Sequence, residues 1–379
     1  MPKAEAVNPP PDGGYAGGNT AEGQTALFSL TTGIYNTAVG LFSLRSNTTG
    51  RNNTAVGAGA LFANATTGEN TAVGLGALFS HTFGNNNTAI GAFALFNDAF
   101  GEENTATGEG ALYSNTNGVA NTANGYAALA SSNGSFNTAT GYSALYSDTI
   151  GIDNTANGFE TLQVNTTGNG NTALGSAALS DNTTGDHNVA IGAFAGLNQT
   201  TGSDNIYIGY GIQAVPGESN ACYIASIFNQ TSSDGIPVLV TSDNKLGTTT
   251  SSKRFKEDIT SMGNTSEALF SLKPVTFRYK KEIDGTGTSQ FGLVAEDVEA
   301  VNPSLVVRDK DGKPYTVRYD AVNAMLLNEF LKKHHKVAKL EATVASLAAT
   351  VKEQAAQLQK VSVEVGINKP AVKMVSRNP

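Results

Sequence analysis

The stretch Asn53-Thr54-Ala55-Val56-Gly57 returns seventeen residues later as Asn70-Thr71-Ala72-Val73-Gly74, and this spacing decides the fold. The Asn that opens the motif recurs twelve times, the last two times in degenerate copies. Every interval is 17 residues, except for one of 16 residues between the seventh and eighth anchors. The anchors are Asn19, Asn36, Asn53, Asn70, Asn87, Asn104, Asn121, Asn137, Asn154, Asn171, Asn188 and Asn205.

A period of 17 residues is too short for a helical hairpin repeat and fits one coil of a β-solenoid, with two short strands and two turns. Small and polar residues alternate in the motif, so one set faces inward and the other outward. Gly33, Gly50 and Gly84 each lie three residues before an anchor and allow positive φ or close backbone approach at a corner. We expect the repeated Asn side chains to form a ladder of amides along the rod.

A Leu follows most anchors by eight positions, and a Phe or Tyr often comes next. We expect this Leu and aromatic column to form an exposed apolar stripe, which identical chains would cover by associating around the rod axis. The repeat also resembles the head repeats of trimeric autotransporter adhesins, which have a shorter period and in which three chains share one β-roll. The resemblance implies a homotrimer. The Leu residues are Leu27, Leu44, Leu61, Leu78, Leu95, Leu112, Leu129, Leu145, Leu162 and Leu179.

The Thr after each anchor forms a column from Thr20 to Thr172. This column has two interpretations: β-branched residues that fill a strand position, or a flat ladder of the kind that ice-binding solenoids display. The calcium-binding nonapeptide pattern is absent, and His81 and His187 stand in different coils, where we expect solvated turn histidines. We therefore expect no metal and no cofactor.

Charge divides the chain into two halves. Residues 1–250 carry 4 Lys/Arg and 17 Asp/Glu, a balance of −13, whereas residues 251–379 carry 20 and 15, a balance of +5. An acidic first half argues against a nucleic-acid partner. No apolar run is long enough to predict a membrane span. The single cysteine, Cys222, excludes an intrachain disulfide, and we expect it to be a small core residue.

The first residues lack the apolar core of a signal peptide, although Ala4-Glu5-Ala6 is compatible with the end of a cleavage site. An extracellular, cell-surface or virion location is the expectation. The predicted organisation is an N-terminal extension (1–18), solenoid repeats (19–205), a β cap or neck with linker (206–250), a small α+β domain (251–321), a coiled-coil helix (322–363) and a flexible tail (364–379).

Four segments beyond residue 250 occur in an order that is itself informative. They are Ser251-Ser252-Lys253-Arg254-Phe255-Lys256-Glu257-Asp258-Ile259, then 272–280, then 291–299 with 302–306, and finally Val317-Arg318-Tyr319-Asp320. Together they resemble the C-terminal intramolecular chaperone of endosialidases and phage tail spikes, a domain also known as an autoproteolytic Ser-Lys peptidase. The resemblance covers about 110 residues and again implies a trimer.

The resemblance implies a cleavage dyad of Ser251 and Lys256, with cleavage of the Thr250–Ser251 bond. A Ser hydroxyl is a poor nucleophile until a base takes its proton, and Lys is such a base only when burial or nearby positive charge lowers its pKa. Ser252 stands where the family has Asp, which puts cleavage in doubt. Without the surrounding domain, Ser and Lys at this spacing are ordinary linker and surface residues.

Heptads predict a five-heptad coiled coil in the final helix. Position a is filled by Phe330, Val337, Val344, Val351 and Leu358, and position d by Leu326, Lys333, Leu340, Leu347, Gln354 and Val361. Val at a with Leu at d favours two strands, whereas the two resemblances imply three chains. His334 and His335 fall at e and f, where we expect solvated side chains.

Three functions follow from the sequence. The first is a structural and adhesive trimeric fibre, of a phage tail or a bacterial surface, whose C-terminal domain templates assembly and then cuts itself once as a serine autoprotease. Its expected partners are its own copies and a cell-surface glycan or receptor. The second is an ice- or glycan-binding solenoid with a trimerisation domain that does not cleave. The third, a polysaccharide-degrading enzyme, lacks paired carboxylates in a cleft-forming domain.

Overall fold

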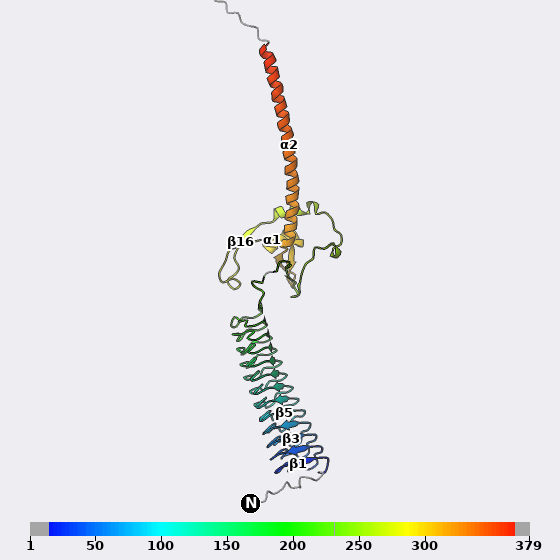
Figure 1. Ribbon diagram of the computed structural model, residues 1–379, viewed down its shortest axis with the longest axis vertical. Helices are drawn as coiled ribbons and strands as arrows, with labels where there is room; N and C mark the ends of the chain where they lie inside the picture. The colour runs from blue at the N-terminus through cyan, green and yellow to red at the C-terminus, as the bar shows by residue number, and fades with distance from the viewer. Residues whose placement is uncertain (1–14, 231, 368–379) are drawn as a thin grey trace, which may run out of the picture. The chain divides into compact units, whose positions relative to one another are not determined.

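The computed structural model describes residues 15–230 and 232–367, which form two compact units. The first unit ends before Ser232 and is a β-solenoid, and the second begins at Ser232. Each is shown in Figure 1. The predicted extension 1–18 and tail 364–379 lie largely outside the described residues.

Thirteen short strands form one parallel sheet in chain order, which confirms the predicted solenoid (Figure 1). Equivalent residues pair throughout, for example Thr54 with Thr71 and Ala55 with Ala72. The strands are β1 Thr20–Glu22, β2 Thr37–Val39, β3 Thr54–Val56, β4 Thr71–Val73, β5 Thr88–Ile90, β6 Thr105–Thr107, β7 Thr122–Asn124, β8 Thr138–Thr140, β9 Thr155–Asn157, β10 Thr172–Leu174, β11 Val189–Ile191, β12 Ile206–Ile208 and β13 Cys222–Ile224. The sheet thus extends one coil beyond the coil of the last anchor.

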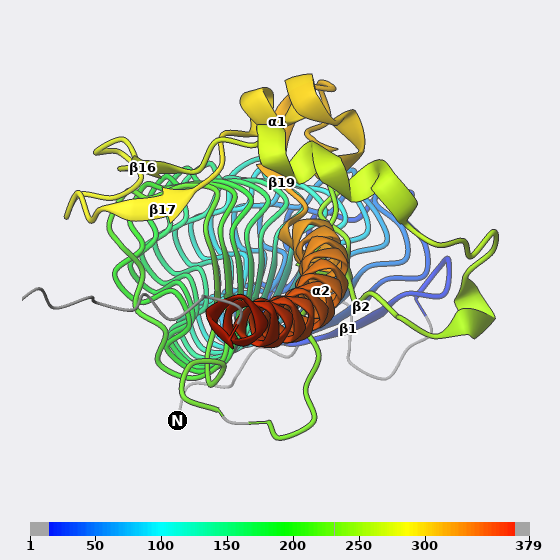
Figure 2. The ribbon, with the colours of Figure 1, turned by 90° about the horizontal axis from the view of Figure 1, so that it is seen from above.

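Each coil contributes one strand and not the two that we predicted. We number coil positions from the Asn anchor as position 1, so that the strand occupies positions 2–4 and the Leu is position 9. Each of these Leu residues has φ between 46 and 53°, which is incompatible with a strand. The opposite side is therefore a stack of turns, in which Leu44 N donates to Ala60 O of the next coil at 3.0 Å. Figure 2 shows the coils repeating one outline.

The core of the solenoid consists mainly of Ala at positions 3 and 8 and Leu at position 9. From Leu44 to Leu179 every position-9 Leu is fully buried. The predicted exposed Leu stripe is therefore wrong, because the left-handed turn directs the Leu inward and leaves only the following aromatic residue at the surface. Phe28 and Tyr146, for example, are 67% and 43% exposed. A single chain thus covers its own Leu column.

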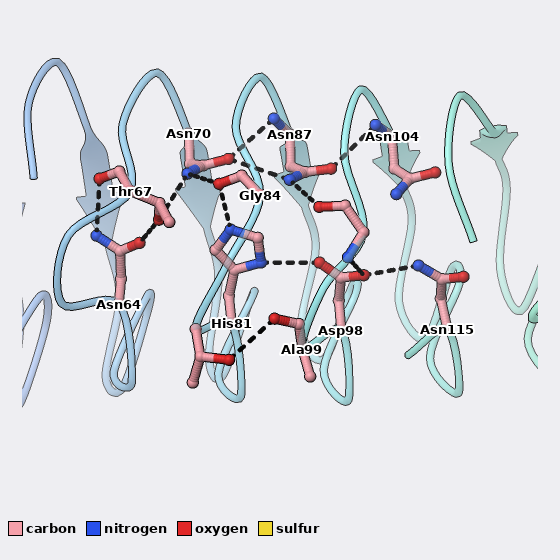
Figure 3. Close-up of polar contacts among 12 residues, drawn as sticks. Asn64, Thr67, Asn70, His81, Gly84, Asn87, Asp98, Ala99, Asn104 and Asn115 are labelled. Carbon is pink, nitrogen blue, oxygen red and sulfur yellow. Dashed lines mark hydrogen bonds and ion pairs between the residues drawn. The ribbon is translucent and has the colours of Figure 1, made fainter. Parts of the chain in front are cut away.

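The predicted Asn ladder is present and fully buried from Asn36 onward. Asn87 is typical: its backbone N–H donates to Asn70 Oδ1 at 2.9 Å, and its Nδ2 donates to Gly101 O at 2.9 Å. One side chain therefore pairs the backbone of its neighbouring coil and of its own corner (Figure 3). Buried polar groups are tolerated only when they are paired in this way.

A second buried polar column occupies position 12, and the sequence analysis did not identify it. It includes His81, which is fully buried, so the expectation of a solvated His81 is wrong. His81 Nε2 lies 2.9 Å from Gly84 O and Nδ1 lies 2.8 Å from Asp98 Oδ2 (Figure 3). A carbonyl only accepts, so Nε2 donates to Gly84 and one proton lies between Nδ1 and Asp98. His187, in contrast, is exposed as expected, 3.6 Å from Asp204.

Asp148 is a second acidic member of the position-12 column. Its carboxylate accepts from Ser132 Oγ at 2.7 Å and from Asn165 Nδ2 at 2.9 Å. Burial raises the pKa of Asp148 to about 6, although these hydrogen bonds and one from Gly151 oppose the shift. Ser132 belongs to the 16-residue coil, which lacks one residue in the turn after it.

Glycine at position 5 is required by close stacking. Gly91 has φ of 138°, and a Cβ there would collide with the carbonyl oxygen of Gly108 in the next coil. The same arrangement recurs at Gly57 and Gly74. Gly110, at position 7, has φ of 66° but open space around it.

Tyr207 closes the core at the C-terminal end of the solenoid. It takes the place of the position-3 Ala, is fully buried and stacks on Tyr223. Its ring fills space opened by Gly196, which stands where other coils have Leu and where a Cβ would approach Tyr207 Cδ2 to 2.9 Å. Cys222 begins β13 at an outward position and is exposed, so its predicted core placement is wrong.

The second unit is small and has mixed secondary structure. Its elements are β14 Leu239–Val240, β15 Leu246–Gly247, η1 Lys253–Phe255, η2 Gly263–Ser271, β16 Val275–Phe277, β17 Gln290–Gly292, α1 Ala295–Val301, η3 Pro303–Leu305, β18 Val306–Arg308, β19 Pro314–Val317 and α2 Tyr319–Ile367. Three antiparallel strand pairs form, β14–β15, β16–β17 and β18–β19. A small core unites α1, β18, β19 and α2 through Val298, Leu305, Val306, Val317 and Met325.

Helix α2 contains the predicted heptads on a single exposed helix. Phe330, Leu340 and Val351 are 65%, 53% and 61% exposed. His334 and His335 are exposed, as expected. The helix is confirmed, whereas its pairing in a coiled coil stays a prediction.

We predict that Asp148→Asn stabilises the solenoid above pH 6. The folded-state pKa of Asp148 is raised, so its ionisation opposes folding. The free-energy cost of this ionisation is absent below about pH 4, grows as the pH rises toward 6 and is then constant. The full difference is on the order of 3 kcal/mol. Urea unfolding across pH 4–8 measures it, with exposed Asp153→Asn in the same coil as the control. A benefit that is independent of pH would contradict this account.

We predict that Gly91→Ala destabilises the solenoid by at least about 3 kcal/mol, because both its φ and the Gly108 carbonyl exclude a Cβ. Gly110→Ala is the matched control and should change stability by less than about 1 kcal/mol, since Ala127 occupies the same position with φ of 53°. Thermal unfolding compares the two variants. Equal losses would show that coil stacking does not impose the glycine.

Candidate functional site

The residues that the sequence singled out for cleavage lie at the start of a short helical turn. Ser252 is the N-cap of η1, and its Oγ accepts from Arg254 N at 3.4 Å. Asp and Ser are both favoured N-caps. Ser252 therefore takes a structural role that the Asp of the family would also suit, and the sequence alone did not identify that role.

Ser251 and Lys256 line the same shallow hollow, together with Lys253, Asp258 and Ile259. Both side chains are exposed. Among the contacts of the described residues, no hydrogen bond joins Ser251 Oγ to Lys256 Nζ. The structure thus brings the predicted pair to one place, but in a single chain it leaves them hydrated.

The two neighbouring cations differ in their placement. Lys253 borders the hollow, whereas Arg254 Nε donates to Ser252 Oγ at 3.3 Å and Arg254 Cζ lies 5.3 Å from the centroid of the Phe255 ring. Only Lys253 therefore adds positive charge beside Lys256. The hollow presents a hydroxyl, an amine and the adjoining Thr250–Ser251 peptide bond. The hydroxyl can attack that bond only when the amine acts as a base. The amine becomes a base when water is excluded from it, because desolvation favours its neutral form.

A buried polar cluster ties η2 to α2. Ser266 Oγ donates to Glu329 Oε1 at 2.6 Å and accepts from Asn328 Nδ2 at 2.7 Å. Lys332 Nζ donates to Glu329 Oε1 at 2.8 Å. The hydrogen bond from Lys332, followed by that from Ser266, lowers the pKa of Glu329. This cluster fixes the base of α2, which carries the heptads.

Residues 15–230 and 232–367 contain no group of three or more His, Cys, Asp or Glu side chains that could hold a metal ion. No helix in the same ranges is long and apolar enough to cross a membrane.

Comparison with known families gives one match. Residues 251–307 match the family described as chaperone of endosialidase. The matched segment runs from Ser251 through β16, β17, α1 and η3 into β18, and it agrees with the resemblance that the sequence motifs carry. No curated protein and no solved structure matches significantly.

We predict that Ser266→Ala loosens the contact between η2 and α2, because the Glu329 carboxylate loses a buried donor. Hydrogen exchange of the η2 amides should accelerate on the order of tenfold. Exposed Ser261→Ala is the control and should leave these rates unchanged. Unchanged exchange in Ser266→Ala would show that packing alone holds η2.

Proposed function

We propose that the chain forms a homotrimeric fibre whose second unit acts as an intramolecular chaperone for assembly. The observation that carries this proposal is the family match to residues 251–307 beside a helix with exposed apolar heptads. Apolar rows along one helix are stable in water when other helices cover them. A single solenoid already buries its Leu core, so the support for association comes from the chaperone unit and from the exposed apolar rows of α2.

A template is useful because the coils are so alike. Chains with near-identical repeats can pair out of register, and each wrong register satisfies most of the same contacts. Association that begins in α2 would fix the register before the repeats meet. The coils would then join one after another from that end.

We further propose one round of self-cleavage at Thr250–Ser251. Neutral Lys256 takes the proton of Ser251 Oγ, and the oxygen attacks the Thr250 carbonyl carbon. The peptide C–N bond breaks as the Ser251 nitrogen takes a proton, which leaves an ester. Water then hydrolyses the ester, giving the Thr250 carboxylate and a tail that begins at Ser251 with a free amine and hydroxyl. Removal of the tail would trap the fibre kinetically, because its nucleus is lost.

The hydrated dyad of the single chain supports a coupling between assembly and cleavage. A protonated amine is not a base, and removal of water from Lys256 favours its neutral form. Burial of the hollow by neighbouring chains would supply this change, so cleavage would follow trimer formation. Lys253 at the rim acts in the same direction.

The fibre that remains would have a structural and adhesive role outside the cell or on a virion. Its acidic surface suits a glycan or protein receptor better than a nucleic acid. The Thr column of β1–β10 alternates along the outward face with Glu, Val, Ile, Leu, Asn or Thr at position 4. This mixed face favours the fibre over the ice-binding alternative.

Mass determination of the purified chain, denatured and native, tests both parts of the proposal. We expect wild type to give two fragments divided at Thr250–Ser251 and a native fibre with the mass of three 1–250 fragments. Ser251→Ala and Lys256→Met should stay full-length at 39.1 kDa and remain trimeric.

Ser252→Asp is the control: it retains an N-cap for η1 and should still cleave. An uncut wild type that is trimeric would refute cleavage but retain the chaperone role. A monomeric Ser251→Ala variant would refute the trimer.

A further inference from the structure

Aromatic rings at position 10 stack along the outside of the solenoid. Phe62, Phe79, Phe96 and Tyr113 follow one another with ring centroids 4.8, 5.2 and 5.4 Å apart and nearly parallel planes. The next coil has Ala130 at this position, the coil after it has a single ring, Tyr146, and Gln163 follows. A rung is therefore missing between Tyr113 and Tyr146, so the outer face of Tyr113 has no ring stacked on it from the coil of Ala130.

A second aromatic ladder, at position 6, begins beside this gap. Tyr126 stacks on Tyr142 at 5.2 Å, and Tyr142 on Phe159 at 5.3 Å. The coil before Tyr126 has Glu109 at position 6. The first ring of this ladder therefore has a carboxylate, and not another ring, on the side of its free face.

Tyr113 and Tyr146 at position 10, with Tyr126 and Tyr142 at position 6, line a groove of about 510 Å³. Small residues at position 7, namely Gly110, Ala127 and Ser143, form its floor, and the larger position-7 residues Phe93 and Glu160 close its two ends. The floor spans three coils, which is about 14 Å at the spacing of stacked strands. Tyr126 and Tyr142 are 50% and 48% exposed along one wall.

We propose that this groove binds a short, uncharged oligosaccharide of two or three sugar units. The C–H faces of a sugar ring pack against aromatic faces, as other apolar groups do. Its hydroxyl groups donate well to carboxylates, which Glu109 and Glu160 supply, and Gln163 adds an amide. Among the described residues that line the groove there is no Lys or Arg, so an anionic sugar would meet repulsion.

A second copy of the chain suits this groove less well. Copies that pair along the rod would use features that recur in every coil, whereas the groove lies over the 16-residue coil 121–136, where the ladder is interrupted. The inference rests on the proposed adhesive role of the fibre. It does not depend on cleavage or chain number, which are measured separately.

Ala130→Phe restores the missing rung and should block the groove. Other coils have Phe at this position, so the variant should fold with unchanged or higher thermal stability. Isothermal titration calorimetry of the full chain would use maltohexaose, cellohexaose, chitohexaose and mannohexaose, with sialyllactose as the anionic comparison. We expect at least one neutral hexaose to bind, and both Ala130→Phe and Tyr126→Ala to weaken it at least tenfold.

Ser180→Phe is the matched control, because it adds the same ring at position 10 of a coil outside the groove and should leave affinity unchanged. The inference is overturned if no neutral hexaose binds at millimolar concentration, if sialyllactose binds as well, or if Ala130→Phe binds normally. A change in native mass in Ala130→Phe without sugar binding by wild type would also overturn it, and would assign the groove to contacts between copies.

Discussion

The solenoid depends on one side chain per coil, the buried Asn at position 1. A coil made of turns and one three-residue strand leaves many backbone groups that no ladder of strands can pair. The Asn amide is short and carries both donors and an acceptor: in Asn87, Oδ1 accepts from the backbone N–H of Asn104 in the next coil and Nδ2 donates to the Gly101 corner of its own coil. Because it repeats at a fixed interval, every copy also holds its neighbour. The interval can shorten only where the turn absorbs the change, as in the 16-residue coil, where Asn137 N still donates to Asn121 Oδ1 at 3.0 Å. An amide without partners in the dry interior would be costly.

This arrangement explains which coil positions keep the same residue and which vary from coil to coil. Ala at position 3 and Gly at position 5 face the closely stacked interior and hardly vary, whereas positions 6, 7 and 10 face outward and range from Gly to Tyr. Position 12 is intermediate. It accepts Asn, His, Asp or Ser because each of these side chains can continue a chain of buried hydrogen bonds, as His81, Asp98 and Asn115 do. Gln199 ends the column and donates to backbone carbonyls instead. Variation on the outer face can therefore change a surface without changing the fold.

The period, the Asn ladder, the parallel stacking and the chaperone likeness could all be predicted from the sequence, because each depends on spacing or on motif order. The inward direction of Leu44 could not be predicted, because it follows from a left-handed backbone conformation that a Leu residue does not indicate. Buried His81 was missed for a related reason: one His among polar residues looks solvated until position 12 is compared across the coils. At Ser251 and Lys256 the motif indicates the pair, but the exposure of their side chains could be known only from the structure. Ser252 shows that a departure from a family pattern is understood only when the local helix is known.

The 16-residue coil has a consequence for the rod as a whole. The residue is lost in the turn after Ser132, while Thr122 and Thr138 still pair in register, so the sheet passes through undisturbed and only the outer contour changes. The series of otherwise equivalent coils therefore contains one coil whose outline marks a fixed position along the rod. A partner that contacts the outer surface of the rod can distinguish positions relative to this coil. If that partner is shifted by one coil, it no longer meets an equivalent surface.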